Sequence, residues 1–233
     1  MREAEFDQYA EDYRSLHADS IRLSGESPDY FASYKVDDVA ERLADLGVLP
    51  ERILDFGGGI GNSITFLRSA FPDAELVLLD PSEKSLAVAE KRHSGQARIT
   101  AFDGVTIPFA DAYFDLVFVA CVFHHIPERD QVPTLGEINR VLRSGGSVFV
   151  FEHNPFNPLT VKAVADCVFD KGAVLISASE MRSRMAAAGF GQSRICYRIF
   201  LPHFLRSLRP LEKLLCWLPL GGQYFVHASK PNS

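Results

Sequence analysis

The chain contains 233 residues, of which 47% are hydrophobic and 23% are charged, and its formal net charge is −6. This length and composition predict one globular domain over residues 1–233, with a full core and no second catalytic domain. The negative charge disfavours nucleic acid as a partner, because its phosphates would be repelled. No apolar segment reaches the ~18 residues of a membrane-spanning helix, and the polar start MREAEFDQYAEDYR does not resemble a signal peptide, so we expect a cytoplasmic protein.

Two helices are predicted ahead of the first strand, over residues 3–18 and 28–47. They contain two pairs of tyrosines spaced four residues apart, Tyr9 with Tyr13 and Tyr30 with Tyr34. Residues at that spacing can share one face of a helix. We expect Lys35, beside the second pair, to be solvated, and the alternative is that it meets a carboxylate of the ligand.

A glycine-rich turn follows the first predicted strand, in the sequence ILDFGGGIGNS at residues 53–63. The turn contains four glycines: Gly57, Gly58, Gly59 and Gly61. Glycine lacks a Cβ, so the main chain can turn tightly there and a ligand can approach the backbone closely. The next helix is expected to begin near Gly61 or Asn62, where its unpaired N–H groups favour polar or anionic ligand groups. This strand, turn and helix together predict a nucleotide-binding site.

Strands and helices alternate through the middle of the chain, which is typical of a doubly wound parallel sheet. Strands are predicted over residues 51–56, 75–80, 97–102, 114–121 and 146–152. The helices between them are predicted over residues 60–71, 82–93 and 129–142. A further helix over 179–188 and two strands, at about 193–200 and 223–229, are expected to complete an α/β fold.

The glycine spacing separates two classes of nucleotide-binding enzyme. The dinucleotide fingerprint G-x-G-x-x-G/A needs glycine or alanine at its sixth position, where this chain has Asn62. The glycines at 57, 59 and 61 instead read G-x-G-x-G, which resembles motif I of the class I S-adenosylmethionine-dependent methyltransferases. Asp80 after the second strand, Asp103 after the third, and the later segment EINRVLRSGGSVFVFE are similar to further motifs of that family. The resemblance covers roughly residues 50–155.

The resemblance implies a Rossmann-like methyltransferase fold, in which a doubly wound seven-stranded sheet is mostly parallel and the final strand is antiparallel. It divides the chain into N-terminal lid helices over 1–49, a cofactor-binding core over 50–155 and an acceptor-side segment over 156–233. In similar methyltransferases the helices before the first strand cover the cofactor. The alternative is that their aromatic residues simply dock these helices on the sheet.

The resemblance also implies S-adenosylmethionine as the cofactor and no metal ion. The expected cofactor-binding residues follow the first three strands: Asp55, Gly57, Gly58, Gly59, Gly61, Asp80, Pro81, Asp103 and Gly104. The glycine turn would meet the cofactor with its backbone. Asp80 would accept hydrogen bonds from both ribose hydroxyls, and Asp103 would hold the adenine edge. Asp55 would orient the turn or reach the methionine amine through water.

Four side chains after the fourth and fifth strands are candidate catalytic groups: His124, His125, Glu152 and His153. A sulfonium methyl group is already activated, so alignment and exclusion of water are the main tasks, and a base adds roughly 10²–10⁴-fold. The two adjacent histidines alternatively serve loop packing or cofactor shielding. Glu152 alternatively caps the loop that follows it.

The four cysteines, Cys121, Cys167, Cys196 and Cys216, are widely spaced and include no C-x-x-C pair. We therefore expect free thiols in the core rather than disulfides or a metal site.

The end of the chain is basic, because residues 181–233 carry eight lysine or arginine residues against Glu212 alone. Over residues 203–218, apolar and basic side chains recur on two different faces, which predicts a basic amphipathic helix interrupted by Pro210. This helix either covers the protein as an ordinary surface helix, contacts an anionic membrane or a lipid-linked acceptor, or forms a dimer contact. The sequence does not predict the oligomeric state.

We therefore expect a methyltransferase that acts on a small molecule or on a glycan or lipid intermediate. Two alternatives stay open. An NAD-dependent oxidoreductase is disfavoured by Asn62 and by the second acid at Asp103. A non-catalytic module would bind S-adenosylmethionine without turnover. The sequence contains no motif that identifies the acceptor or that separates oxygen, nitrogen and carbon methylation.

Overall fold

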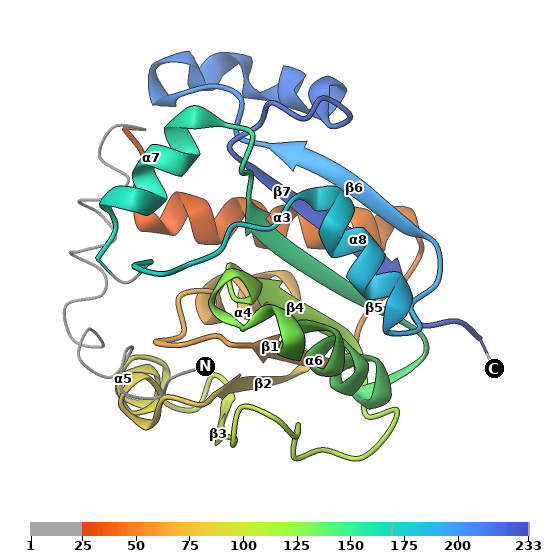
Figure 1. Cartoon of the computed structure of the whole chain (residues 1–233). Coiled ribbons are helices and arrows are strands. Elements are labelled where there is room, and N and C mark those ends of the chain that lie inside the picture. Colours follow the sequence, from red (N-terminus) through yellow and green to blue (C-terminus); the bar gives the residue numbers. More distant parts are fainter. Residues whose placement is uncertain (1–24, 169, 233) are drawn as a thin grey trace.

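A computed structural model describes residues 25–168 and 170–232, so the helix predicted over 3–18 lies outside the described residues. One seven-stranded sheet has the order β3-β2-β1-β4-β5-β7-β6 (Figure 1). The strands are β1 (Arg52–Phe56), β2 (Glu75–Asp80), β3 (Arg98–Ala101), β4 (Phe114–Ala120), β5 (Leu142–His153), β6 (Ser193–Arg198) and β7 (Gln223–Ser229). The helices are α3 (Pro28–Asp45), α4 (Ile64–Ala70), α5 (Glu83–His93), η2 (Phe123–His125), α6 (Glu128–Val141), α7 (Pro158–Asp166), α8 (Ala178–Ala187) and η3 (His203–Leu215).

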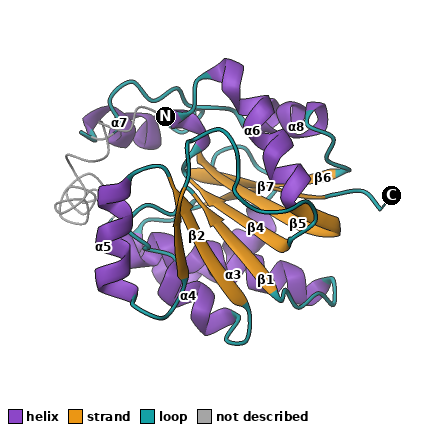
Figure 2. Cartoon of the chain, turned by 90° about the horizontal axis from the view of Figure 1, so that it is seen from below, coloured by secondary structure: helices purple, strands orange, loops and turns teal. Residues whose placement is uncertain are grey.

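The central strands are apolar on both faces because helices cover both sides of the sheet. Helices α3, α4 and α5 pack on one face, and α6 and α8 pack on the other (Figure 2). Strands β1 to β5 pair in parallel, whereas β7 is antiparallel to both β5 and β6. The predicted doubly wound sheet and its antiparallel last strand are confirmed.

Two elements begin four residues away from their predicted starts. Helix α4 begins at Ile64 instead of residue 60, because the glycine turn continues to its N-cap, Ser63. Strand β5 begins at Leu142 instead of residue 146, and its pairing with β4 shifts register between Phe114 and Leu116. The chain thus enters the sheet early and then passes through an irregularity before regular pairing begins at Ser147.

Helix α3 packs into the hydrophobic core. Phe31 and Tyr34 are buried, and the ring of Tyr34 lies 6.3 Å from that of Phe151 in β5. The rings of Tyr30 and Tyr34 share a helix face, with their centroids 5.8 Å apart. These contacts dock the helix on the sheet, and its role as a cover over the cofactor stays a prediction. Lys35 was wrongly expected to be solvated: it is buried, and its Nζ donates a hydrogen bond to the carbonyl of Phe31 at 3.1 Å.

The cysteine prediction was wrong for one pair. Cys196 in β6 and Cys216 after η3 form a disulfide, whereas Cys121 and Cys167 are not in a disulfide. The 20-residue separation concealed this pairing, because the chain leaves β6, forms η3 and returns alongside the strand. The backbone N–H of Tyr197 donates to the carbonyl of Cys216 at 2.8 Å, which holds the two segments together.

The predicted amphipathic helix near the C-terminus is a 3-10 helix with a kink at Leu205. Pro210 lies inside it and has no N–H to donate, which disfavours a continuous α-helix. The buried carboxylate of Glu212 accepts hydrogen bonds from the N–H groups of Ile199, Phe200 and Leu201, so η3 is fastened to the chain that follows β6. None of the described helices is both long and apolar enough to cross a membrane.

Candidate functional site

The glycine turn after β1 has a backbone that other residues would strain. Gly57, Gly59 and Gly61 have φ angles of 69°, 52° and 78°, in the left-handed region. A Cβ on Gly57 would lie 2.7 Å from a methyl carbon of Val122, so this close approach requires glycine. The N–H of Gly57 donates to the carbonyl of Leu79 at 2.7 Å and fixes the turn against the end of β2.

Asp80 ends β2 beside that turn. Its Oδ2 accepts a hydrogen bond from the N–H of Gly59 at 2.9 Å, and its Oδ1 accepts one from the N–H of Ser82 at 2.8 Å. The intervening Pro81 is buried. Each carboxylate oxygen has a second lone pair, so Asp80 can still accept hydrogen bonds from a ligand.

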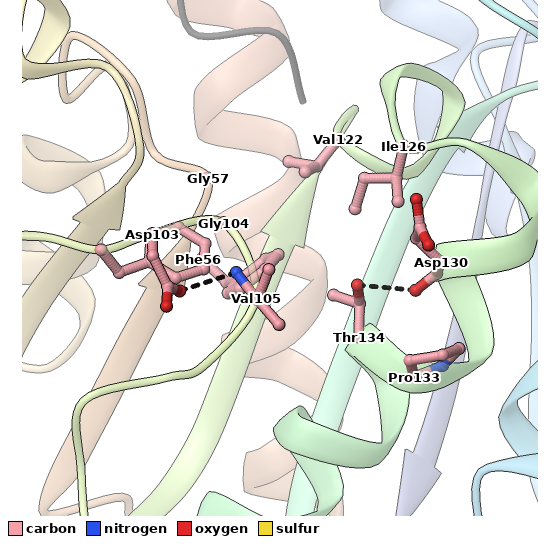
Figure 3. Close-up of a pocket in the computed structure, with 11 residues that line it drawn as sticks. Phe56, Gly57, Asp103, Gly104, Val105, Val122, Ile126, Asp130, Pro133 and Thr134 are labelled. Carbon is pink, nitrogen blue, oxygen red and sulfur yellow. Dashed lines mark hydrogen bonds between the residues drawn. The ribbon is translucent and has the colours of Figure 1, made fainter.

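Asp103 and Gly104 follow β3 and line a cavity of about 280 Å³ with Phe56, Gly57 and Val122 (Figure 3). The Asp103 Oδ1 accepts hydrogen bonds from the N–H groups of Thr106 at 2.7 Å and Val105 at 2.8 Å. These two hydrogen bonds hold the pKa of the Asp103 carboxyl below its usual value. The cavity therefore brings the glycine turn and the acid after the third strand to one place.

Asp55 lies under the same turn and is buried. Its Oδ2 has no hydrogen-bond partner among the described residues. Burial, with a smaller contribution from the charge of Asp80, raises the pKa of Asp55 to about 7. A buried carboxylate without partners is costly, so Asp55 is suited to a polar or cationic ligand group.

A second cluster lies beyond β4 and β5, where the carboxyl ends of these strands meet. Glu152 is fully buried and accepts hydrogen bonds from the N–H groups of Val122 at 3.1 Å and Phe123 at 2.7 Å. Its other oxygen lies 2.5 Å from Nδ1 of His124. The sequence-based alternative was that Glu152 caps the loop after its own strand, β5. In the structure Glu152 instead caps the loop after β4.

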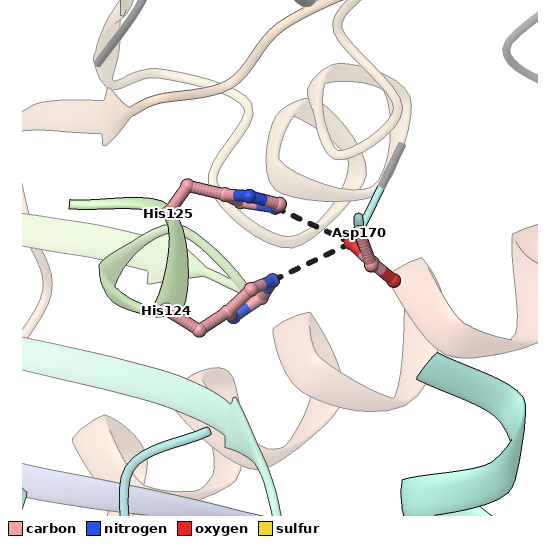
Figure 4. Close-up of side chains that lie close together, drawn as sticks. All are labelled: His124, His125 and Asp170. Carbon is pink, nitrogen blue, oxygen red and sulfur yellow. Dashed lines mark ion pairs between the residues drawn. The ribbon is translucent and has the colours of Figure 1, made fainter. Parts of the chain in front are cut away.

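Asp170 joins this cluster from the loop after α7 (Figure 4). Its Oδ1 lies 3.3 Å from Nε2 of His125 and 3.6 Å from Nε2 of His124. Burial alone would lower the pKa of His124, but Glu152 and Asp170 outweigh it and hold that pKa well above its usual value. The pKa of His125 is lowered, chiefly by burial.

His153, which ends β5, is held by a chain of hydrogen bonds. The Tyr34 hydroxyl donates to Oε1 of Gln223, and Nε2 of Gln223 lies 3.3 Å from Nδ1 of His153. Because the Tyr34 contact orients the Gln223 amide, Nδ1 of His153 accepts and the remaining proton lies on Nε2. Burial lowers the pKa of His153 to about 4, so the ring is neutral near pH 7.

The structure thus forms two neighbouring groups from the predicted site residues. The first group is the glycine turn with the three acids near it, Asp55, Asp80 and Asp103. The second group lies beyond β4 and β5 and contains His124, His125, Glu152 and His153. Val122 connects the groups, since its side chain lines the cavity and its N–H is bound to Glu152. Sequence reasoning missed Asp170 and Gln223. Asp170 lies in an irregular segment with no motif, and Gln223 reaches the site only through the antiparallel pairing of β7 with β5.

Comparison with known proteins gives one family and several partial relatives. Residues 54–150 match the model of a family described as a methyltransferase domain. A demethylmenaquinone methyltransferase from Thermus thermophilus is 34% identical over 119 residues, which cover 49% of this chain and 53% of the relative. One from Thermotoga maritima is 37% identical over 112 residues, or 48% of each chain. The chain therefore spans about half the length of the curated relatives it matches.

Solved structures share the fold at low sequence identity. An S-adenosylmethionine-dependent methyltransferase from Thermotoga maritima, described as a possible histamine N-methyltransferase, superposes with a TM-score of 0.68 at 17% identity. That match covers 97% of this chain and 98% of the other. Human N-acetylserotonin methyltransferase, solved with S-adenosylmethionine, has a TM-score of 0.66 at 15% identity over 99% of this chain and 57% of its own. The fold is common to all three proteins.

Proposed function

We propose that this chain, whose residues 54–150 match the model of a methyltransferase domain, is a class I S-adenosylmethionine-dependent methyltransferase that transfers a methyl group from S-adenosylmethionine to a small-molecule acceptor. The observation that carries this proposal is the glycine turn, with Asp80 and Asp103 at the same edge of the sheet. When bound, the sulfonium of S-adenosylmethionine supplies the activated methyl group.

The residues around the turn fit this cofactor. The missing Cβ of Gly57 permits close contact, and Gly58, Gly59 and Gly61 form the rest of the same backbone surface. Asp80, beside Pro81, would accept hydrogen bonds from the ribose hydroxyls, and Asp103 with Gly104 would contact the adenine edge. Asp55 would take the methionine amine, directly or through water, which would satisfy its buried oxygen.

The histidine cluster is assigned to the acceptor side. Glu152 and His124 are buried and bonded to each other, so we assign them to positioning the loop after β4. His125 and His153 keep partial exposure and would face the acceptor. Both have lowered pKa values, so either ring is neutral at pH 7 and able to take part in proton transfer or hydrogen bonding. The backbone N–H of His125 donates to the carbonyl of Val122 at 3.1 Å, and Val122 lines the cavity, which supports the assignment of His125.

We further propose that an apolar or lipid-linked acceptor reaches the site from an anionic membrane. A set of exposed apolar side chains, here called the apolar rim, gathers on η3, α7 and the loops beside them: Phe156, Leu159, Phe204, Leu214, Trp217 and Leu220. Asn157 donates a hydrogen bond to the carbonyl of Leu220 at 2.9 Å, which holds the two segments together. Exposed apolar surface of this extent is typical of interaction sites.

The apolar rim lies where such an acceptor would enter. His153 ends β5 opposite Gln223, and the chain between β6 and β7 forms η3 at this same edge (Figure 1). Arg206 is exposed on η3, where its Nη1 lies 3.1 Å from Nε2 of His203, a partner without a negative charge. Arg209 and Lys213 are instead paired with the acids Glu26 and Glu41. Arg206 therefore provides a cation beside the rim for anionic lipid headgroups.

The first test is calorimetric titration of the protein with S-adenosylmethionine, S-adenosylhomocysteine and NAD. Micromolar binding of either adenosyl compound without binding of NAD supports the proposal, and the reverse pattern supports an NAD-dependent oxidoreductase. Transfer of a radiolabelled methyl group is then measured with demethylated quinones and with glycan and lipid-linked intermediates. Tight cofactor binding without transfer to any acceptor would favour the non-catalytic module.

A further inference from the structure

Three side chains beyond β4 converge on one point. The Nε2 atoms of His124 and His125 and a carboxylate oxygen of Asp170 all lie within 4.8 Å of one another (Figure 4). The histidines come from η2 and Asp170 from the loop after α7, so the tertiary fold brings the carboxylate to the histidine pair.

The His124 ring is held with its Nε2 directed at Asp170. Glu152 lies 2.5 Å from Nδ1 of His124 and is itself fixed by two backbone N–H groups. A carboxylate bound to the far nitrogen of a metal-ligating histidine is a recurrent arrangement, because it sets the tautomer and orients the ring. Nε2 of His124 is buried and has no hydrogen-bond partner among the described residues.

Of the two histidine contacts with Asp170, only that of His125, at 3.3 Å, is within hydrogen-bond range. His124 Nε2 lies 3.6 Å from Asp170 Oδ1, which is beyond hydrogen-bond range. Ligand atoms around a tetrahedral zinc ion, with bonds near ~2.0–2.1 Å, lie roughly 3.3 Å apart. The separations of 3.3 and 3.6 Å between Asp170 and the two histidines are close to that value.

We propose that His124, His125 and Asp170 bind one divalent transition-metal ion, of which zinc is the representative. Two imidazole nitrogens and one carboxylate suit zinc and similar ions, whereas magnesium and calcium prefer oxygen ligands throughout. On binding, the ion would displace the proton from Nε2 of His124, and that proton would pass to solvent. Three protein ligands leave a fourth position for water or for a substrate atom.

The fourth position would lie on the side of His125 and Asp170, which are less deeply buried than His124. The side chain of His124 is 1% exposed, whereas those of His125 and Asp170 are 14% and 9% exposed. The ion would polarise a hydroxyl or amine of the acceptor and thereby ease loss of its proton. This role rests on the proposed methyl transfer, whereas binding of the ion does not.

The test measures ion binding by tag-free protein that has been treated with a chelator and dialysed. We expect one Zn²⁺ per chain with micromolar or tighter affinity by calorimetry, and an absorption spectrum with Co²⁺ that indicates four or five ligands without thiolate. Asp170→Asn and His125→Ala are each expected to weaken Zn²⁺ binding by roughly tenfold or more. His203→Ala, which alters a more exposed histidine on η3, is the matched control and should leave the affinity unchanged.

Two controls are needed to attribute a loss of Zn²⁺ affinity to the loss of a ligand side chain. Circular dichroism first establishes that the variants are folded, and Mg²⁺ serves as the oxygen-preferring control ion. Failure of wild-type protein to bind Zn²⁺ or Co²⁺, or equal binding by folded Asp170→Asn and His125→Ala proteins, would overturn the proposal. Cofactor titration is run on the same samples, so loss of the ion site and loss of the proposed methyltransferase function can be distinguished.

Discussion

At the end of β2 the carboxylate of Asp80 holds the glycine turn through the N–H of Gly59. Its proposed second role is to accept hydrogen bonds from the ribose of the cofactor. We expect Asp80→Ala to lower the affinity for S-adenosylmethionine by roughly tenfold or more, since one lost charge-assisted bond is worth about 1.5–3 kcal/mol. Calorimetric titration measures this change.

The control for that substitution is Asp73→Ala, an exposed acid in the loop before β2, which should leave the affinity unchanged. The bonds from Gly59 and Ser82 mean that Asp80→Ala also lowers thermal stability. Asp80→Asn keeps the volume of the side chain and separates the two effects. Unchanged affinity in a folded Asp80 variant would contradict the ribose assignment.

Asp55 makes stability depend on pH in an unusual direction. Burial raises its pKa to about 7 in the folded protein, against about 3.9 in an unfolded chain. Between these values the folded state binds the extra proton, so this group's contribution to stability is full below pH ~4 and is lost as pH rises through about 7. The substitution Asp55→Asn removes this titration. We therefore expect its effect on the free energy of unfolding to be more stabilising at pH 8 than at pH 5, by roughly 1–3 kcal/mol.

Urea denaturation of wild type and Asp55→Asn at pH 5 and pH 8 measures that difference. Comparison between the two proteins cancels the other titrating groups, including Asp38, whose pKa burial raises to about 6. An equal effect of the substitution at both pH values would show that Asp55 does not titrate in this range.

At the scale of an element, the glycine turn depends on close packing as well as on backbone conformation. Gly57→Ala would place a Cβ 2.7 Å from Val122 at a φ of 69°. Gly95→Ala is the matched control, because its φ is 73° but a Cβ there meets nothing within 4 Å. Gly95→Ala should cost about 1 kcal/mol from the left-handed backbone alone, and Gly57→Ala should cost roughly 1–3 kcal/mol more from overpacking.

Denaturant unfolding of both variants tests this prediction, together with the double variant Gly57→Ala/Val122→Ala. Removal of the Val122 methyl groups should recover part of the loss at Gly57. If the two glycine variants lose equal stability, the contact with Val122 does not constrain the turn.

The segment from β6 through η3 is closed by a disulfide, which changes the number of free thiols. Cys121 and Cys167 keep their thiol groups, whereas Cys196 and Cys216 are joined in the disulfide. Thiol titration in denaturant should therefore detect two reactive groups in unreduced protein and four after reduction. Cys216→Ser should lower stability by about 3 kcal/mol, because the closed loop has a length of 20 residues. Four reactive thiols before reduction would contradict the pairing.

At the scale of the whole molecule, the apolar rim predicts binding to membranes. Phe204 and Trp217 are 79% and 74% exposed, so each can insert into lipid without unfolding the core. We expect the protein to co-sediment with vesicles of phosphatidylglycerol and phosphatidylcholine more strongly than with phosphatidylcholine alone. The double variant Phe204→Ser/Trp217→Ser should weaken that binding by roughly tenfold or more.

The matched control is Leu49→Ser, because Leu49 is 74% exposed but lies in the loop before β1, away from the rim. Equal vesicle binding by the double variant and wild type would contradict membrane binding through the apolar rim, which would then serve another partner. Sedimentation equilibrium without vesicles distinguishes a second copy of this chain, since the double variant would then lose the dimer.

The sequence by itself was sufficient for the α/β order of elements and for the residues of the glycine turn. Those features are local: apolar runs form the strands, and glycine positions set the turn, so neighbouring residues suffice to predict them. Asp80 and Asp103 were predictable for the same reason, because Asp80 ends β2 and Asp103 lies two residues after β3.

Only the tertiary structure decided which distant residues meet. Asp170 joins His124 and His125, Gln223 joins His153, and Cys196 joins Cys216 across long loops whose course has no periodic signal. Burial also reversed the expectation for Lys35, because its neighbours in space, not in sequence, determine its exposure. Local backbone preference is encoded residue by residue, whereas the chemistry of a buried cluster depends on how separate elements pack together.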